Sequence, residues 1–233
     1  MIAVARFAVR RFLMATVFGG ALMVPSVAAY ADPLGLAQSG SGGLEVESDN
    51  GIEWRRNEQV LIARGNAVAK RGNSRVDADE LRALYRDRDG QSEIYRIIAT
   101  GNVKLSSETD VATGDQAIYD IDDAVVVLTG KDLRYKTPNE TLTAEESLEY
   151  WETERMAVAR GNAVAVADDR TLRGDVLTAR FEAGKNGENE LSRIDGDGNV
   201  TIRTSTDFVV GNQGVYDAKT GIATLVGSVK ITR

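Results

Sequence analysis

A repeated pattern of short, glycine-led segments is the feature that most constrains how this chain folds. Six segments alternate apolar with polar residues after a glycine: GNAVAK (Gly65), GNVKLS (Gly101), GKDLRY (Gly130), GNAVAV (Gly161), GNVTIR (Gly198) and GSVKIT (Gly227). They follow one another at intervals of 36, 29, 31, 37 and 29 residues. Strict alternation is typical of strands with one dry and one wet face. A spacing near thirty residues indicates a repeat architecture.

Two further elements recur between the glycine-led segments. One comprises ADELRALY, GDQAIYD, AEESLEYW, GDVLTARF and GNQGVYD, and the other RIIAT, AVVVLT, RMAVAR, LSRID and IATLV. DADELRALYRDRD and TAEESLEYWETERM have the composition of short helices, but they occupy repeat positions filled elsewhere by β-favouring segments, and we expect strands there. The sequence therefore predicts an all-β fold of roughly fifteen short strands, each of about 5 to 7 residues.

Two architectures fit such a series of strands. An antiparallel meander can close into a β jelly roll, a sheet folded over like a taco. A right-handed β-helix also repeats at intervals near thirty residues. We expect hairpin loops of variable length at 86–92 and 183–189, and both architectures tolerate them.

Composition weighs against an enzyme and against nucleic-acid binding. The chain has no His and no Cys, which removes the commonest general bases, nucleophiles and transition-metal ligands. Residues 1–31 contain three basic and no acidic side chains, so residues 32–233 carry 25 Lys+Arg against 35 Asp+Glu, a formal charge of −10. An acidic chain is a poor partner for nucleic acid or for an anionic membrane surface. We predict no enzymatic activity, no cofactor and no metal.

The N-terminus has the pattern of an export signal. Arg6, Arg10 and Arg11 precede the apolar run 12–29, and Ala29-Tyr30-Ala31 offers a small-x-small cleavage site. We predict a cleaved secretory signal peptide at 1–31, a flexible lead-in at 32–43 and a single domain at 44–233. A retained membrane anchor is the alternative, since the apolar run nearly suffices to span a bilayer.

The apolar face of the strands is the candidate site. It is rich in Ala and β-branched residues and poor in large aromatics, whereas a close-packed interior of this size normally fills its volume with bulkier side chains. A face of small aliphatic groups suits a groove that another molecule fills; the alternative is an ordinary core. The candidate groove residues are Leu81, Tyr85, Val103, Leu105, Ala117, Tyr119, Leu148, Leu177, Phe181, Val200, Ile202, Val229 and Ile231.

Acidic residues near the glycines have a structural interpretation. We expect Asp79, Asp115 and Asp175 to accept hydrogen bonds from turn backbone. Asp195-Gly-Asp-Gly-Asn199 resembles the start of a calcium loop, but Val200 and Thr206 stand where that loop needs glycine and glutamate. A glycine-rich turn fits this segment better.

The order and spacing of these motifs resemble the LptA/OstA-like family of periplasmic lipopolysaccharide-transport proteins. The segments that carry the resemblance are EVESDNGIEW, VLIARGNAVAKRGNSRVDADELRALY, GDQAIYDIDDAVVVLTGKDLRY, RGNAVAVADDRTLRGDVLTARF and, from Asp197, DGNVTIRT with GNQGVYDAKTGIATLVGSVKIT. They cover most of 44–233, and the last unit, 197–233, makes the chain longer than the commonest members.

The resemblance implies a periplasmic antiparallel β jelly roll whose interior receives the acyl chains of lipid A. It further implies head-to-tail self-association, and bridging between an LptC-like inner-membrane subunit and an LptD-like outer-membrane protein. Three alternatives remain open: an LptC-like subunit that keeps its N-terminal anchor, an exported β-helix carbohydrate-active enzyme, and a purely structural self-assembling β protein.

Overall fold

The computed structural model of the 233-residue chain describes residues 7–8, 44–88, 90–184 and 189–233. The predicted lead-in and, apart from Phe7–Ala8, the predicted signal peptide lie outside the described residues. Within those ranges the fold is all-β, with seventeen strands in one antiparallel sheet and a single 3-10 turn, η1 (Arg56–Glu58). The all-β antiparallel prediction is therefore confirmed. No helix among the described residues is long and apolar enough to cross a membrane.

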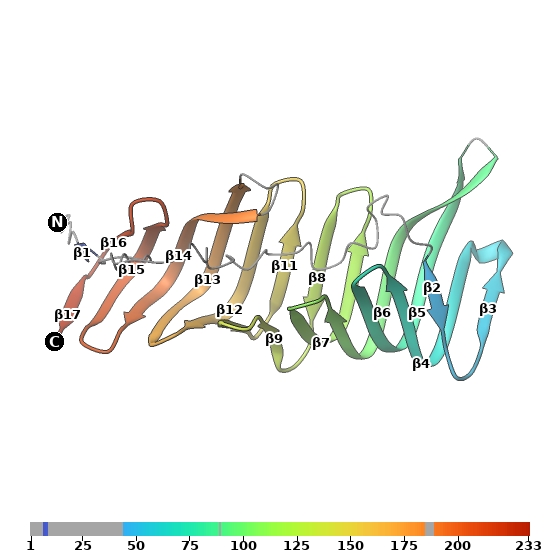
Figure 1. Ribbon diagram of the computed structural model, residues 1–233, viewed down its shortest axis with the longest axis horizontal. Coiled ribbons are helices and arrows are strands. Elements are labelled where there is room, and N and C mark those ends of the chain that lie inside the picture. Colours follow the sequence, from blue (N-terminus) through green and yellow to red (C-terminus); the bar gives the residue numbers. More distant parts are fainter. Residues whose placement is uncertain (1–6, 9–43, 89, 185–188) are drawn as a thin grey trace, which may run out of the picture.

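The strands follow one another along the long axis of the molecule, from β2 and β3 at one end to β17 at the other (Figure 1). Their bounds are β1 (Phe7–Ala8), β2 (Glu45–Glu47), β3 (Ile52–Arg55), β4 (Val60–Arg71), β5 (Ser74–Arg88), β6 (Gln91–Ser106), β7 (Val111–Asp120), β8 (Val125–Thr129), β9 (Leu133–Lys136), β10 (Glu140–Ala144), β11 (Ser147–Trp151), β12 (Met156–Ala167), β13 (Arg170–Ala183), β14 (Asn189–Arg203), β15 (Phe208–Asp217), β16 (Ile222–Val226) and β17 (Lys230–Thr232).

The sheet is folded into two limbs, which we call limb A and limb B. Limb A contains β3, β8, β11 and β16, and limb B contains β2, β9, β10 and β17. The long strands β4–β7 and β12–β15 cross the bend and contribute one part to each limb. On β4, for example, residues 60–63 pair with β3 in limb A, while residues 68–70 pair with β2 in limb B. This is the folded-over sheet of a jelly roll, and the β-helix alternative is wrong.

Strand length is where the sequence prediction was wrong. Strands β4–β6 and β12–β14 run for 12 to 16 residues instead of about 5 to 7. The RIIAT and GNVKLS segments, for instance, are the two halves of the single strand β6. The glycine-led segments at Gly130 and Gly227 lie between separate strands, β8 and β9 in one case and β16 and β17 in the other. The other four do not begin new strands after turns. They continue a strand beyond a β-bulge, where the pairing register shifts and the strand bends from one limb into the other.

The bend has a repeated local structure. At four of the bulges a glycine and the asparagine after it both adopt the left-handed region: Gly65-Asn66, Gly101-Asn102, Gly161-Asn162 and Gly198-Asn199. The φ angles are 70° to 82° for the glycines and 43° to 49° for the asparagines. Glycine takes this conformation without a steric cost, and asparagine is among the residues that tolerate it best. The Gly-Asn dipeptide therefore marks, in the sequence, the positions at which these four strands bend.

The other sequence predictions about local structure have mixed outcomes. DADELRALYRDRD and TAEESLEYWETERM form strands as expected, in β5 and β11. The loop at 86–92 is a hairpin closed by the pair Arg88 and Gln91. Asn189 pairs with Ala183 across the second predicted loop, of which residues 185–188 lie outside the described ranges. The predicted glycine-rich turn at Asp195–Asn199 is instead part of the continuous strand β14.

The hydrophobic core lies between the two limbs, near the bend. One cluster extends from β4 to β13 and includes Leu81, Val103, Tyr119, Leu133 and Leu148. A second, smaller cluster of Val200, Val209 and Leu225 lies at the C-terminal end. Leu172 packs against both clusters and links them. The largest fully buried side chains, Leu133, Val103 and Val200, all belong to limb B close to the bend.

Candidate lipid-binding groove

The inner surface between the limbs is lined by rows of apolar side chains that run across the strands. In limb A the row next to the bend passes through paired residues from Ala63 to Leu177: Ala63, Leu81, Ala99, Ala117, Leu128, Leu148, Ala159 and Leu177. Each of these side chains is buried. Because paired residues in a sheet point to the same face, the register alone makes this row continuous across eight strands.

The inner face has partly exposed apolar residues only at a distance from the bend. Farther out on both limbs, a second set of apolar side chains packs against the core but remains only half-buried: Ile97, Ala112, Tyr135, Leu142, Ala165 and Leu172. Near the bend the two limbs fill the space between them, whereas farther out partly open side chains lie beside buried ones such as Leu105, Tyr119 and Val126. The inner surface is thus a closed core at the bend and a partly exposed apolar surface toward the free ends of the limbs.

Most of the predicted groove residues lie on this inner surface. Seven belong to the main core cluster: Leu81, Val103, Leu105, Ala117, Tyr119, Leu148 and Leu177. Val200 belongs to the C-terminal cluster, against which Ile202 and Val229 pack. Ile231 is exposed on the terminal strand β17. Tyr85 and Phe181 lie toward the free ends of limb A, the first buried and the second half-buried.

Several inner residues were missed by the sequence analysis. Leu133 and Leu142 lie on β9 and β10, and both face the interior. The alternation of Leu133 and Tyr135 with Arg134 and Lys136 was a usable signal for β9. Ile97 and Ala99 had a weaker signal, because Ile98 between them is also apolar and obscures the period of two.

Polar groups at the free end of limb B are internally satisfied. The buried carboxylate of Asp110, in the β6–β7 loop, accepts a hydrogen bond from Tyr135 Oη at 2.9 Å and one from Thr109 Oγ1 at 2.9 Å. No buried side-chain N or O atom among the described residues lacks a hydrogen-bond partner. The inner surface therefore offers apolar contact and carries no unpaired buried side-chain polar atom in the described part of the chain.

Glycines with ordinary backbone angles also shape the inner surface. A Cβ on Gly114 would lie 2.8 Å from Leu133 Cδ2 and 2.9 Å from Leu128 Cγ. At the C-terminal end, a Cβ on Gly196 or on Gly214 would lie 3.1 Å from a methyl group of Val200. These glycines let the opposite limb approach, since any larger side chain would push the limbs apart.

Acidic residues at the bend accept hydrogen bonds that stabilise the bulges. Asn102 Nδ2 donates to Asp79 at 3.0 Å, and Asn199 Nδ2 donates to Asp175 at 3.0 Å. Asn66 and Asn162 donate in the same way to Asp49 and Glu145. The expected backbone donor is confirmed for Asp115, which accepts from the Lys131 N–H at 2.8 Å. For Asp79 and Asp175, the donor is a side-chain amide instead.

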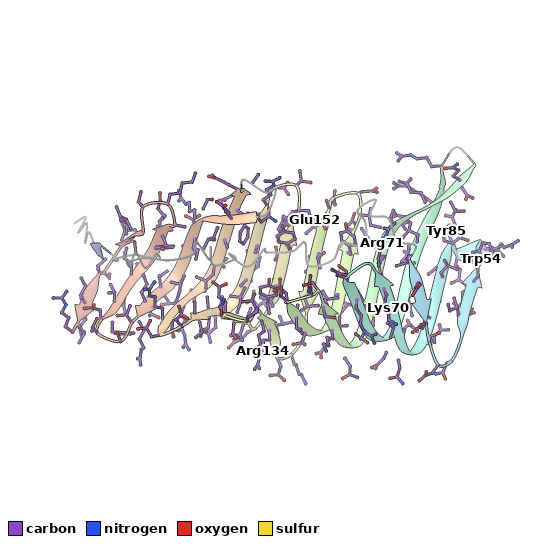
Figure 2. All side chains as sticks on the ribbon, viewed as in Figure 1. Trp54, Lys70, Arg71, Tyr85, Arg134 and Glu152 are labelled. Atoms are coloured by element: carbon purple, nitrogen blue, oxygen red, sulfur yellow. The ribbon has the colours of Figure 1, made fainter. Side chains whose placement is uncertain are left out.

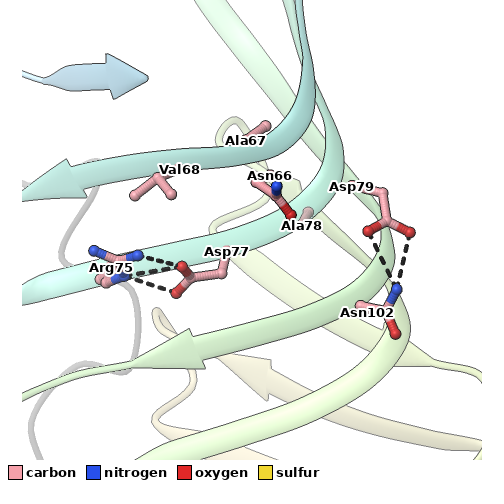
Figure 3. Close-up of a pocket in the computed structure, with 8 residues that line it drawn as sticks. All are labelled: Asn66, Ala67, Val68, Arg75, Asp77, Ala78, Asp79 and Asn102. Atoms are coloured by element: carbon pink, nitrogen blue, oxygen red, sulfur yellow. Dashed lines mark hydrogen bonds and ion pairs between the residues drawn. The ribbon is translucent and has the colours of Figure 1, made fainter. Parts of the chain in front are cut away.

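A small pocket lies at this bend, between β4, β5 and β6 (Figure 3). Its volume is about 190 Å³ and its lining includes Arg75, Asp77, Asp79 and Asn102. Arg75 pairs with Asp77, and burial only partly offsets this contact, so the pKa of the Asp77 carboxyl is lowered. The described residues contain no cluster of three or more acidic side chains arranged to hold a metal ion. The pocket's polar groups are thus engaged with one another.

Outer-face carboxylates of limb A are held ionised by arginines. Asp120 is hydrogen-bonded by Arg96, which lowers the pKa of its carboxyl. At Glu149, burial favours the neutral form, but hydrogen bonds from Arg160 Nε (2.7 Å), Ser147 Oγ (2.9 Å) and Trp151 Nε1 (3.1 Å) outweigh burial and lower the pKa. Arg55 and Arg64 lower the pKa of exposed Glu53 to about 2. These carboxylates are engaged as ion-pair partners.

Exposed apolar side chains gather at the two ends of the array. Leu44, Val46, Ile52 and Trp54 lie at the β2–β3 end, and Phe208, Ile222 and Ile231 lie at the β15–β17 end. Trp54 and Tyr85 lie next to each other (Figure 2), and Trp54 Nε1 donates to Tyr85 Oη at 2.7 Å. The Arg56 guanidinium lies 4.2 Å from the Trp54 ring. At the C-terminal end, β16 is paired with the short strand β1. Sheet ends with exposed apolar residues and free strand edges, as at β2, β3 and β17, are surfaces for strand addition.

An antiparallel sheet folded over an apolar interior, with apolar ends, defines the class of folded-over β jelly rolls. Within this class, residues 45–146 match the protein-family model described as "LptA/(LptD N-terminal domain) LPS transport protein". This part of the chain is thus similar to the LptA/OstA-like domain of lipopolysaccharide-transport proteins, in agreement with the resemblance of the sequence motifs.

Two individual proteins are also similar to the chain. An uncharacterized protein of Rhizobium meliloti (strain 1021) is 29% identical over 102 residues, which is 42% of this chain and 54% of that protein. The chain thus aligns with only about half of the length of this relative. The crystal structure of LptH, the LptA homologous periplasmic component of the lipopolysaccharide transport device of Pseudomonas aeruginosa, aligns with 17% identity and a TM-score of 0.43. That alignment covers 51% of this chain and 82% of LptH.

Proposed function

We propose that the chain is a periplasmic lipopolysaccharide carrier, without enzymatic activity, that holds lipid A acyl chains between its two limbs. The observation that carries this proposal is the set of half-exposed apolar residues on the inner surface, such as Ile97, Tyr135 and Leu142, beyond the closed core at the bend. The LptA/OstA-like match of residues 45–146 supports lipopolysaccharide as the cargo.

The physical reason for such a carrier is the cost of moving acyl chains through water. Each exposed methylene costs about 0.8 kcal/mol, so a lipid with several acyl chains faces a barrier of tens of kcal/mol. An apolar surface that accompanies the lipid lowers this barrier. In the proposal, acyl chains enter from the free ends of the limbs and contact half-buried residues such as Ile97 and Leu142, while Val103 and Val200 at the bend hold the limbs together.

The apolar ends support end-to-end assembly. In the proposal, the β2–β3 end of one copy joins the β15–β17 end of the next, or an end joins an LptC-like or LptD-like partner. Such joining would make the inner surface continuous from one molecule to the next. It would also cover Ile52 and Trp54 at one end and Ile231 at the other, which are exposed in the single chain.

A binding experiment tests the carrier function directly. Fluorescently labelled lipopolysaccharide is titrated with the purified chain, and unlabelled competitors are intact lipopolysaccharide and the same molecule stripped of its acyl chains. The proposal predicts saturable binding and competition by the intact lipid only. Equal competition by the deacylated sugar, or no binding by a folded sample, would contradict it.

The same domain would also serve an LptC-like subunit that keeps its N-terminal segment as an anchor. The apolar run at 12–29 is the observation that favours this second candidate. The mass of the N-terminus in cells separates the two, since a chain beginning at Asp32 is the exported carrier and one beginning at Met1 or Ile2 is the anchored subunit.

A further inference from the structure

The outer face of limb B carries basic side chains in two rows across the strands. From β6 to β17, the row nearer the bend contains Lys104, Thr113, Arg134, Thr143, Val164, Arg173, Thr201, Val210 and Lys230. The next row contains Ser106, Val111, Lys136, Thr141, Val166, Thr171, Arg203, Phe208 and Thr232. Between β6 and β17 the two rows hold six basic residues and no acidic residue. In the β2–β5 part of limb B the same rows carry Asp77, Glu47 and Glu45 beside Arg75 and Lys70.

All six basic side chains are exposed, and none forms a salt bridge with another described residue. Arg203 lies over the Phe208 ring beside it, 5.3 Å from the ring centroid. Lys104, at the β6 margin, is next to Asp77, which is already paired with Arg75. Arg134 is labelled in Figure 2. The charges of this face are therefore directed to solvent.

Limb A differs, because its outer-face arginines are paired with acidic neighbours. Arg82 contacts Glu80, Arg96 contacts Asp120, and Arg180 and Arg193 both contact Asp195. Further acidic residues line the bend, where Asn102 and Asn199 bind Asp79 and Asp175. The net negative charge of the chain therefore conceals a segregated basic face, which the charge count in the sequence could not reveal.

The dimensions and chemistry of this face indicate an extended anionic partner. Eight inter-strand steps separate Lys104 from Lys230, which is roughly 38 Å at about 4.8 Å per step. The face is one side of a sheet, with hydroxyl groups between the charges, and exposed Val166 and Phe208 add apolar contact. A compact anion would engage only one or two of these charges, whereas a plane of phosphates would engage all six.

We propose that the outer face of limb B docks on the phosphate surface of an anionic phospholipid bilayer. Lys and Arg side chains near such a surface each contribute a factor of about five to the binding constant, and salt screens the attraction. Docking through this face leaves limb A and the β2–β3 end of the array free. The proposal is independent of the acyl-chain function of the inner surface.

Vesicle co-sedimentation tests this docking surface. Large vesicles of phosphatidylcholine with about one third phosphatidylglycerol are compared with pure phosphatidylcholine vesicles at low and at high salt. The test variant combines Lys104→Gln, Arg134→Gln, Arg173→Gln and Lys230→Gln. The matched control combines Arg82→Gln, Arg96→Gln, Arg180→Gln and Arg193→Gln, which removes the same charge from limb A. Melting curves and N-terminal masses establish that all samples are folded and identically processed.

The proposal predicts that the wild-type chain and the limb A control bind the anionic vesicles within threefold of each other. It predicts that the limb B variant binds at least tenfold more weakly, and that high salt abolishes the difference. Equal binding by the two variants, no wild-type binding to anionic vesicles at low salt, or binding of soluble polyphosphate without binding of vesicles would overturn it.

Discussion

The amide of Asn102 donates hydrogen bonds to both carboxylate oxygens of Asp79, at 3.0 Å and 3.2 Å, across the bend of the sheet. Asn102 has a φ angle of 48°, and the backbone of Gly101 before it is packed against the same carboxylate. The contact recurs at Asn199 and Asp175, 97 and 96 residues farther along the chain. The same local arrangement thus occurs at both of these bends of the sheet.

Replacing Asn102 tests this arrangement. Asn102→Ala removes the hydrogen bonds and places a less tolerant residue in the left-handed region, so the free energy of unfolding should fall by about 1–2 kcal/mol. Asn102→Gly should lower the free energy of unfolding by a smaller amount, because glycine adopts this backbone conformation freely. Asn73→Ala, in the exposed β4–β5 loop, is the control and should stay within about 0.5 kcal/mol of wild type. Denaturant unfolding provides the measurement, and an equal loss in Asn73→Ala would contradict the account.

Gly114 tests how closely the limbs pack. Gly114→Ala places a methyl group within 3 Å of Leu133 and Leu128, and this overpacking should cost about 1–3 kcal/mol of unfolding free energy. Gly214→Ala, whose Cβ would have a looser contact of 3.1 Å with Val200, should cost less. Thermal melting of the two variants compares them directly, and the reverse order of stability would contradict the packing described for the inner surface.

The ion pair of Glu149 and Arg160 predicts a pH dependence. The folded-state pKa of Glu149 lies below its ordinary value of 4.5, so its stabilising contribution is complete above that pH and is lost as the pH falls through the folded-state pKa. Glu149→Gln and Arg160→Gln should both be less stable than wild type at pH 7, and this difference should shrink below about pH 4.5. Urea unfolding between pH 7 and pH 3 tests this. Stability curves that stay parallel to wild type across that range would show that the pair contributes nothing.

The ends of the array predict how copies associate. Ile52→Lys places a charge on the exposed β2–β3 end and should weaken self-association at least tenfold. Val166→Lys is the control, because it adds the same charge to an exposed valine on the outer face of limb B, away from the ends. Sedimentation velocity over a concentration series measures both. Unchanged association in Ile52→Lys, or equal weakening in the control, would argue against end-to-end joining.

The sequence predicted the all-β class and the recurrence of its elements, because alternation in segments such as GNVKLS reports directly on strand structure. It missed the length of the strands, since Gly101-Asn102 has the composition of a turn and yet forms a bulge within β6. Only the pairing of Thr100 with Gln116 and of Val103 with Gly114 reveals that one strand serves both limbs.

The candidate site was predicted in part for the same reason. Val103 and Leu105 follow a clear alternation and lie on the inner surface as expected. Ile97 and Ile98 are adjacent, equally apolar and both half-buried, so composition could not decide which of them faces inward. The basic face of limb B could not be predicted from the sequence either. Lys104, Arg134 and Lys230 come from distant segments, and only the strand order brings them into one row.

The Ile97 and Ile98 pair offers the most direct test of the central claim that acyl chains lie between the limbs. A photo-crosslinking amino acid is placed at either position in cells, and adducts are probed for lipopolysaccharide. Both sites are half-buried isoleucines on β6, but Ile97 pairs with Tyr119 on the inner surface and Ile98 pairs with Ile118 on the outer surface. The account predicts a lipopolysaccharide adduct at position 97 and little or none at position 98. Equal adducts at both positions, or none at position 97 in a folded protein, would contradict it.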